Sequence, residues 1–299
     1  MRVVIASGKG GAGKTCVTAS LADVWRGPLV AVDTDAEAPN LHLFLPPRMT
    51  ETTTAYLDVP NMDPEKCIHC EKCRNICTYK AIASFAGRIT LFPDMCHGCG
   101  GCFAVCPSGA LVHGKRELGV LESGDVLNGS ARYLAGRTRI GESMTPPLLR
   151  QELRRLSAML EERSADALID SPPGVSCPAV TVAREADVIL LVADPTPFGF
   201  HDFKLAHQAF LPMELPVAAV INRAGAEGNA EGDEAVRAYC REHDVPVLAE
   251  LPFEREAAEQ YASGRLLAEL SPAWRERFEH LRDALVEFGA KRAREAHHA

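Results

Sequence analysis

Two runs of four cysteines with identical spacing constrain this chain more than any other feature of its sequence. Both runs read C-x2-C-x2-C-x3-C, and the second repeats the first after 29 residues. The cysteines are Cys67, Cys70, Cys73 and Cys77, then Cys96, Cys99, Cys102 and Cys106. The repeat extends beyond them, because Ala81 and Ile82 recur as Ala110 and Leu111. A duplication that preserves every thiol position indicates that the thiols act together as metal ligands.

The spacing favours iron–sulfur chemistry over the two other common uses of cysteine. Structural zinc is typically held by two separated ligand pairs, whereas three close cysteines and a more distant fourth suit a 4Fe–4S cubane. Disulfides require an oxidising compartment, and the first residues read as strand and loop rather than an apolar leader. We therefore expect a cytoplasmic protein with two 4Fe–4S clusters.

The runs resemble those of bacterial two-cluster ferredoxins, in which the fourth cysteine of each run serves the other cluster. The resemblance therefore implies two ligand sets that exchange one member. Cluster one takes Cys67, Cys70, Cys73 and Cys106, and cluster two takes Cys96, Cys99, Cys102 and Cys77. Pro107 follows the second run as in ferredoxins, but Thr78 follows the first. This departure removes no ligand, and we expect it to make the two potentials unequal.

The first residues read as a nucleotide-binding unit. An apolar run over 2–6 predicts a buried strand, and the pattern over 16–25 predicts a helix. Between them lies G-x4-G-K-T, whose backbone amides cradle phosphates, with Lys14 for the β- and γ-phosphates and Thr15 for Mg²⁺. The residues expected around the nucleotide are Gly8, Lys9, Gly10, Gly11, Ala12, Gly13, Lys14, Thr15 and Cys16.

The second lysine of this loop, Lys9, makes it resemble the deviant Walker A motif of the MinD, ParA, Mrp and nitrogenase iron protein superfamily. In those relatives the early lysine reaches the partner's nucleotide across a dimer interface. The resemblance implies a Mg²⁺-dependent ATPase that forms a homodimer, or a heterodimer with a paralogous ATPase. A solvated loop lysine is the alternative.

Further superfamily landmarks follow in order. Asp33-Thr-Asp35 resembles the first switch, which implies that Asp35 positions the attacking water. Asp170-Ser-Pro-Pro-Gly174 resembles the second switch, which implies that Asp170 holds Mg²⁺ through water. The resemblance also implies an adenine contact from Asn222 and a flank for the base at Pro252. Alone, either aspartate is equally explained as a strand-end residue that caps a helix.

Strands alternating with helices predict an α/β fold, with a doubly wound, mostly parallel sheet and helices on both faces. The cysteine runs interrupt this alternation. We expect a P-loop ATPase domain over 1–60 and 115–299, and an inserted ferredoxin-like α+β module over 61–114. Short β-like pieces over 116–142 are expected to return the chain to the ATPase, before a helix over 147–162.

Charge and hydropathy restrict the partners. The net charge of −8 disfavours a nucleic-acid surface, and no apolar run approaches a membrane span. A C-terminal stripe from Trp274 to Phe288 predicts a helix docked on the core, because its other face is mixed in sign rather than basic. We therefore expect no stable membrane insertion.

The leading hypothesis is an ATPase whose cycle gates electron transfer to a redox partner protein. The alternative is an Mrp-like scaffold that delivers iron–sulfur or other metal cofactors, although such carriers use a C-x-x-C pair that is absent outside the insert. MinD-like positioning on a membrane and cobyrinic acid-type amidation are weaker, because the tail is mixed in charge and no glutaminase segment is present. Cys177 is either a small buried hydrophobe or a ligand of a bridging cluster.

Overall fold

The computed structural model describes residues 1–298, with side chains described to Glu295. The chain divides into two compact units. Unit one comprises Met1–Thr52, Leu121–Arg137 and the chain from Leu149 onward, and unit two comprises Thr53–Val120 and Thr138–Leu148. The range 61–114 lies within unit two.

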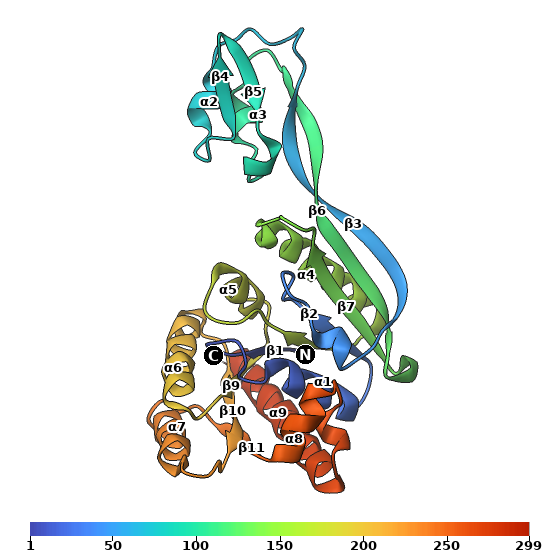
Figure 1. Cartoon of the computed structure of the whole chain (residues 1–299), viewed down its shortest axis with the longest axis vertical. Coiled ribbons are helices and arrows are strands. Elements are labelled where there is room, and N and C mark those ends of the chain that lie inside the picture. Colours follow the sequence, from blue (N-terminus) through green and yellow to red (C-terminus); the bar gives the residue numbers. More distant parts are fainter. Residues whose placement is uncertain (299) are drawn as a thin grey trace. The chain divides into compact units, whose positions relative to one another are not determined.

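A nine-stranded sheet forms the framework, in the order β11-β10-β9-β1-β8-β2-β7-β6-β3 (Figure 1). Its strands are β1 (Arg2–Ala6), β2 (Leu29–Asp33), β3 (Arg48–Met62), β6 (Leu111–Val126), β7 (Ala131–Thr138), β8 (Asp166–Asp170), β9 (Val188–Ala193), β10 (Val217–Ala224) and β11 (Val247–Pro252). From β11 to β7, every neighbouring pair is parallel. The predicted α/β fold with a mostly parallel sheet is confirmed.

Helices cover both faces of this sheet because alternate strand residues point to opposite sides. Val3 and Ile5 belong to one core, with residues of α1 and α9, whereas Val4 and Ala6 belong to the other, with α4 to α7. The helices on the two faces are α1 (Lys14–Val24), α4 (Thr145–Arg163), α5 (Cys177–Ala183), α6 (Pro197–Phe210), α7 (Ala230–Glu242), α8 (Arg255–Ala262) and α9 (Pro272–His298).

The edge of the sheet differs from the prediction. The stretch over 116–142 was expected to hold short β-like pieces, but β6 is one continuous strand of 16 residues and β7 has eight. The three-residue turn Leu127–Gly129 joins them, so they form an antiparallel hairpin. Strand β3 also runs antiparallel to β6, because Arg48 lies opposite Gly124 and Val59 lies opposite Gly114.

Unit two holds two short helices and a two-stranded antiparallel sheet (Figure 1). These elements are α2 (Lys72–Ile76), β4 (Ile82–Phe85), β5 (Arg88–Leu91) and α3 (Gly101–Val105). Its small core comprises Ile82, Ile89 and Cys102, with Cys67, Cys73 and Cys77 among the half-buried side chains packed against it. The cysteines therefore supply part of the small hydrophobic core of unit two.

The C-terminal helix α9 is docked on the core, as predicted. Trp274, Phe278, Leu281 and Leu285 are at most 2% exposed, and they pack with α1 and the sheet. None of the helices in the described part of the chain is long and apolar enough to cross a membrane.

Replacing Leu281 by Ala is expected to lower the free energy of unfolding by about 2–5 kcal/mol, because it leaves a cavity in a fully buried layer. Urea unfolding followed by the fluorescence of Trp25 and Trp274 measures this loss. Val286→Ala is the control in the same helix, because Val286 is 43% exposed, and it should change the value by less than about 0.5 kcal/mol. Equal effects of the two substitutions would contradict the docked position of α9.

Candidate functional site

The glycine-rich loop between β1 and α1 has a backbone that only glycine allows at two positions. A Cβ at Gly8 would lie 1.9 Å from the carbonyl oxygen of Asp202. Gly13 has a φ of 100°, and a Cβ there would lie 2.2 Å from Nδ2 of Asn222. The motif glycines thus permit a close approach of the loop to α6 and β10.

The motif lysine Lys14 lies inside this loop. Its side chain is buried, and its Nζ donates to Oγ of Ser7 at 3.1 Å. Oγ of Ser7 in turn donates to the carbonyl oxygen of Lys9 at 2.7 Å. Burial lowers the pKa of Lys14, while the charges of Asp170, Asp35 and Asp33 oppose that shift. The loop therefore presents a cation next to three acidic side chains.

The two residues predicted for Mg²⁺, Thr15 and Asp170, are in direct contact. The Thr15 hydroxyl donates to Oδ2 of Asp170 at 2.6 Å. The other carboxylate oxygen, Oδ1, is buried and has no hydrogen-bond partner among the described residues. A buried carboxylate with one free oxygen beside a hydroxyl is a donor set that suits Mg²⁺. These residues therefore fit the ion that the sequence implies.

The two aspartates predicted to form the first switch have different environments. Asp33 is fully buried and accepts hydrogen bonds from the backbone N–H groups of Asn40 and Leu41, at 2.7 and 2.8 Å. Burial raises the pKa of Asp33 to about 6 despite these bonds. Asp35 is half-buried, and burial also raises its pKa. Asp33 thus holds the following turn, and Asp35 is the more accessible of the two.

Lys9 forms an ion pair within its own chain, which sequence reasoning did not anticipate. Its Nζ lies 2.9 Å from Oδ2 of Asp194, and an Arg223 guanidinium nitrogen lies 3.7 Å from the same oxygen. Asp194 follows β9 and is 5% exposed. In the sequence, the only signal that pointed to Asp194 was its position directly after a buried strand. Any reach of Lys9 toward a partner requires this pair to break.

The two residues predicted at the base lie on neighbouring strands. Nδ2 of Asn222 donates to the carbonyl oxygen of Ala12 at 2.8 Å, so this side chain also fixes the loop. Pro252 ends β11 opposite Ala224, and the adjacent Phe253 is 52% exposed. Cys16 is buried in α1, where burial raises the pKa of its thiol to about 12. The roles of Asn222, Pro252 and Cys16 toward a nucleotide stay predictions.

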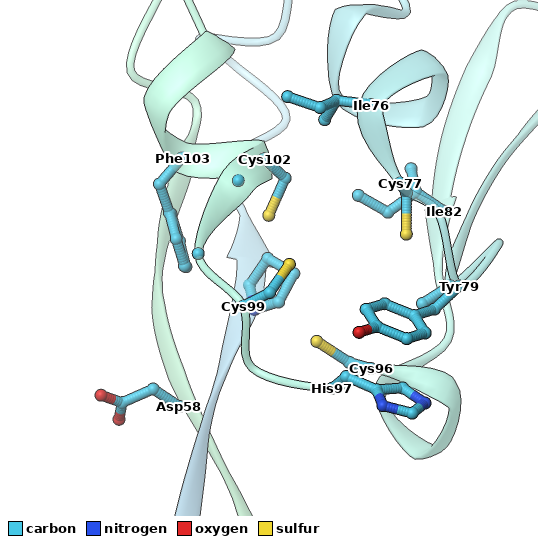
Figure 2. A pocket seen from close by; sticks show the side chains of 14 residues that line it. Asp58, Ile76, Cys77, Tyr79, Ile82, Cys96, His97, Cys99, Cys102 and Phe103 are labelled. Carbon is cyan, nitrogen blue, oxygen red and sulfur yellow. The ribbon is translucent and has the colours of Figure 1, made fainter.

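In unit two, the eight cysteines of the runs line two separate pockets. One, with about 430 Å³ that no atom occupies, part of it open to solvent, is lined by Cys77, Cys96, Cys99 and Cys102 (Figure 2). The other, with about 340 Å³, is lined by Cys67, Cys70, Cys73 and Cys106. Each pocket combines three cysteines of one run with the fourth of the other. Among the described residues, no group of three or more His, Cys, Asp or Glu side chains is arranged to hold a metal ion.

The short helices explain this exchange. Helix α2 carries Cys73 and ends before Cys77, and α3 carries Cys102 and ends before Cys106. Both fourth cysteines have extended backbone at the helix end, with ψ of 98° and 106°. The helix thus carries the chain away from the pocket of its own run, and α2 packs against α3.

The surroundings of the two pockets differ. At the 430 Å³ pocket, the rings of Tyr79 and His97 stack with centroids 3.6 Å apart, and Phe103 also lines the wall (Figure 2). Glu71 and Lys72 line the other pocket instead. Cys177 lies apart from both pockets in sequence, at the start of α5, and is exposed rather than buried.

Burial raises the pKa of Asp170 to about 7, from an ordinary value of 3.8. Mg²⁺ prefers the ionised carboxylate, so affinity for Mg²⁺–nucleotide should fall about tenfold between pH 8 and pH 6. Titration calorimetry at the two pH values measures this. In the absence of nucleotide, the raised pKa makes folding depend on pH in the opposite direction from binding. The contribution of Asp170 to the free energy of unfolding falls as pH rises from about 4 to about 7.

Asp170→Asn is the control for this pH dependence. It removes the titrating group, so it should bind Mg²⁺–nucleotide weakly and with little change between the two pH values. A flat pH profile for the unaltered chain would contradict the role of Asp170.

Comparisons with known proteins identify a nucleotide-binding domain in this chain. The CobQ/CobB/MinD/ParA nucleotide binding domain family matches residues 3–267. Two uncharacterised proteins of Methanocaldococcus jannaschii are 28% and 26% identical, over 68% and 75% of this chain and 70% and 81% of their own length.

Solved structures share the fold. The Pyrococcus furiosus cell division ATPase MinD is 20% identical, with a TM-score of 0.57 and coverage of 96% of this chain and 98% of that chain. The septum site-determining protein MinD of Pyrococcus horikoshii, solved with Mg-ADP, is 18% identical, with a TM-score of 0.56 and 95% coverage of both chains. The chain described above belongs to the CobQ/CobB/MinD/ParA nucleotide-binding family.

Proposed function

We propose that this chain is an ATPase whose hydrolysis cycle gates electron transfer through two 4Fe–4S clusters held in unit two. The observation that carries the proposal is the pair of four-cysteine pockets in a chain that also carries a nucleotide loop of this ATPase family. Neither feature alone points to coupling.

The cysteine pockets fit the clusters by their chemistry. In a 4Fe–4S cluster each of four thiolates binds a different iron, so the four sulfurs surround a larger group than a single ion. Four thiols line each pocket, and the residues that line the pocket in Figure 2 include no lysine or arginine. When bound, such clusters supply one-electron transfer.

In the nucleotide site, Lys14 and the loop amides bind the phosphates, and Thr15 and Asp170 hold Mg²⁺ through the hydroxyl and through water. Asp35, half-buried and near the charge of Lys14, orients the attacking water. The hydrogen bonds of Lys14 with Ser7 and of Thr15 with Asp170 hold these side chains in the loop, where the phosphates and Mg²⁺ would bind.

We further propose that ATP brings two copies together through Lys9. In this chain Lys9 pairs with Asp194, whose carboxylate is buried. A partner's phosphates offer Lys9 more negative charge than one carboxylate, so nucleotide favours the exchange. The pair with Asp194 thus opposes dimerisation until ATP is bound.

Covalent continuity supports coupling between the nucleotide and the cysteine pockets. In the sequence, all eight cysteines lie between the two switch aspartates, Asp35 and Asp170. Strands β3 and β6 each have residues in both units. A change of either switch on ATP binding therefore acts on segments that continue directly into unit two. The redox partner that receives the electrons is a separate protein.

Paired substitutions test the exchanged ligand sets. Cys77→Ser with Cys96→Ser should remove one cluster and leave about half of the iron and sulfide, because both residues line one pocket. Cys77→Ser with Cys67→Ser should remove both clusters. Iron and sulfide analysis with EPR spectroscopy measures the loss. If each run serves its own cluster, the two results are reversed.

The gating itself is tested on the full chain with its clusters reconstituted. ATP should shift the cluster potentials or the rate of electron delivery to an acceptor dye, while cluster content stays constant. Lys9→Ala is the control, because it should abolish both ATP-dependent dimerisation and the ATP effect. A dimer that still forms on ATP addition contradicts the role of Lys9. Rapid transfer of clusters to an apo-acceptor contradicts gating and favours a scaffold.

A further inference from the structure

A buried ion pair lies against the cysteine loop of the 430 Å³ pocket. Arg116 on β6 and Glu142, shortly before α4, approach to 2.9 Å, with side chains 6% and 2% exposed. Removing two charges from water is costly, so a buried pair is weak evidence for a purely stabilising role. The contacts of the pair point instead to the neighbouring pocket.

Arg116 contacts the backbone of a predicted cluster ligand. Its second guanidinium nitrogen donates to the carbonyl oxygen of Cys96 at 3.3 Å. The nitrogen that pairs with Glu142 also donates to the carbonyl oxygen of Asp94 at 3.3 Å. Arg116 thus fixes the turn that leads into Cys96 and places a positive charge one carbonyl group from this ligand.

Glu142 is held in place by contacts of its own. One carboxylate oxygen accepts from the N–H of Met144 at 2.9 Å, and the other lies 3.5 Å from Nε of Arg139. Arg139 also pairs with Asp94, whose side chain is 82% exposed. Water and salt screen these outer charges, but they screen the buried pair much less.

The equivalent position of the other repeat has a different environment. Cys67 corresponds to Cys96 in the duplication, and its Sγ lies 3.9 Å from Nδ1 of His69. The pocket of Cys67 is lined by His69, Glu71 and Lys72. The buried pair therefore distinguishes one pocket from the other.

We propose that Arg116 and Glu142 are positioning residues that set the reduction potential of the cluster held by Cys77, Cys96, Cys99 and Cys102. The inference rests on the cluster assignment of the proposed function. Reduction adds one electron to the cluster, so the Arg116 charge favours the reduced form and raises the potential. The Glu142 carboxylate opposes it and lowers the potential. Net charge and hydrogen bonding around a cluster are known determinants of its potential.

A charge cycle on the full chain tests this assignment. The variants are Arg116→Met, Glu142→Gln and the double substitution, each reconstituted with both clusters. An EPR-monitored redox titration measures the two potentials, and Cys99→Ser identifies the signal of the Cys96 pocket by its loss. Arg116→Met should lower that potential and Glu142→Gln should raise it. The double variant should return toward the unaltered value, and the second cluster should not shift.

A merely structural role gives a different result. If the pair only holds the Cys96 loop in place, each single substitution loosens the loop and exposes the site to water. The potential of the Cys96-pocket cluster would then move in the same direction in both single variants, and it would move further in the double variant. That outcome overturns the proposal. Arg132→Met is the matched control, because Arg132 pairs with Asp125 in unit one at 2.6 Å, and it should shift neither potential.

Two further results separate the possible failures. Arg116→Lys retains the charge, so it should keep the potential closer to the unaltered value than Arg116→Met; an equal shift overturns the proposal. A chain that binds no iron and sulfide on reconstitution refutes the proposed function and this inference with it. A loaded chain whose potentials do not follow the sign of the charge refutes the inference alone.

Discussion

The parallel register of β1, β8 and β2 is the constraint on which the nucleotide site depends. Asp170 is level with Ile5 of β1 on one side and with Asp33 of β2 on the other. The three strands end at the same edge, directly where the glycine-rich loop leaves β1. Two acidic side chains and Lys14 therefore meet in a buried region. Burial raises the pKa of both aspartates and lowers that of Lys14, so each group is poised for a charged ligand.

A third buried acid extends this region beyond the sequence motifs. Glu152 of α4 is fully buried, and burial raises its pKa well above the ordinary value, with a further contribution from the charge of Asp33. Burial of this kind disfavours the charged form of a carboxyl group. In the sequence, Glu152 reads as one more acid of an amphipathic helix between arginines. Its burial follows from the packing of α4 against β2 and β7, which no local pattern reports.

Unit two preserves its duplication in the backbone as well as in the thiols. Gly98, Gly100 and Gly109 have φ values between 62° and 78°, in the left-handed region that favours glycine. The equivalent residues of the first repeat, His69, Glu71 and Lys80, have the same conformation at φ values of 55° to 57°. A side chain in this region costs energy that glycine avoids, so the two repeats share a geometry but not its strain. The two pockets are alike in their thiols and in the apolar pair Ala81-Ile82 or Ala110-Leu111, and they differ in the aromatic and charged side chains around them.

The sequence by itself determined those features that depend on neighbours along the chain. The strand before Gly8, the glycine-rich loop, the strand-end positions of Asp33 and Asp170 and the repeated cysteine spacing all follow from local pattern, and the structure has the predicted strands and helices in those places. Only the tertiary structure decided which distant side chains meet. Lys9 with Asp194, Glu142 with Arg116 and the burial of Glu152 depend on strand order and helix packing over long separations. Local pattern reports the periodicity of a segment, but the partner of a charge is set by the chain that folds against it.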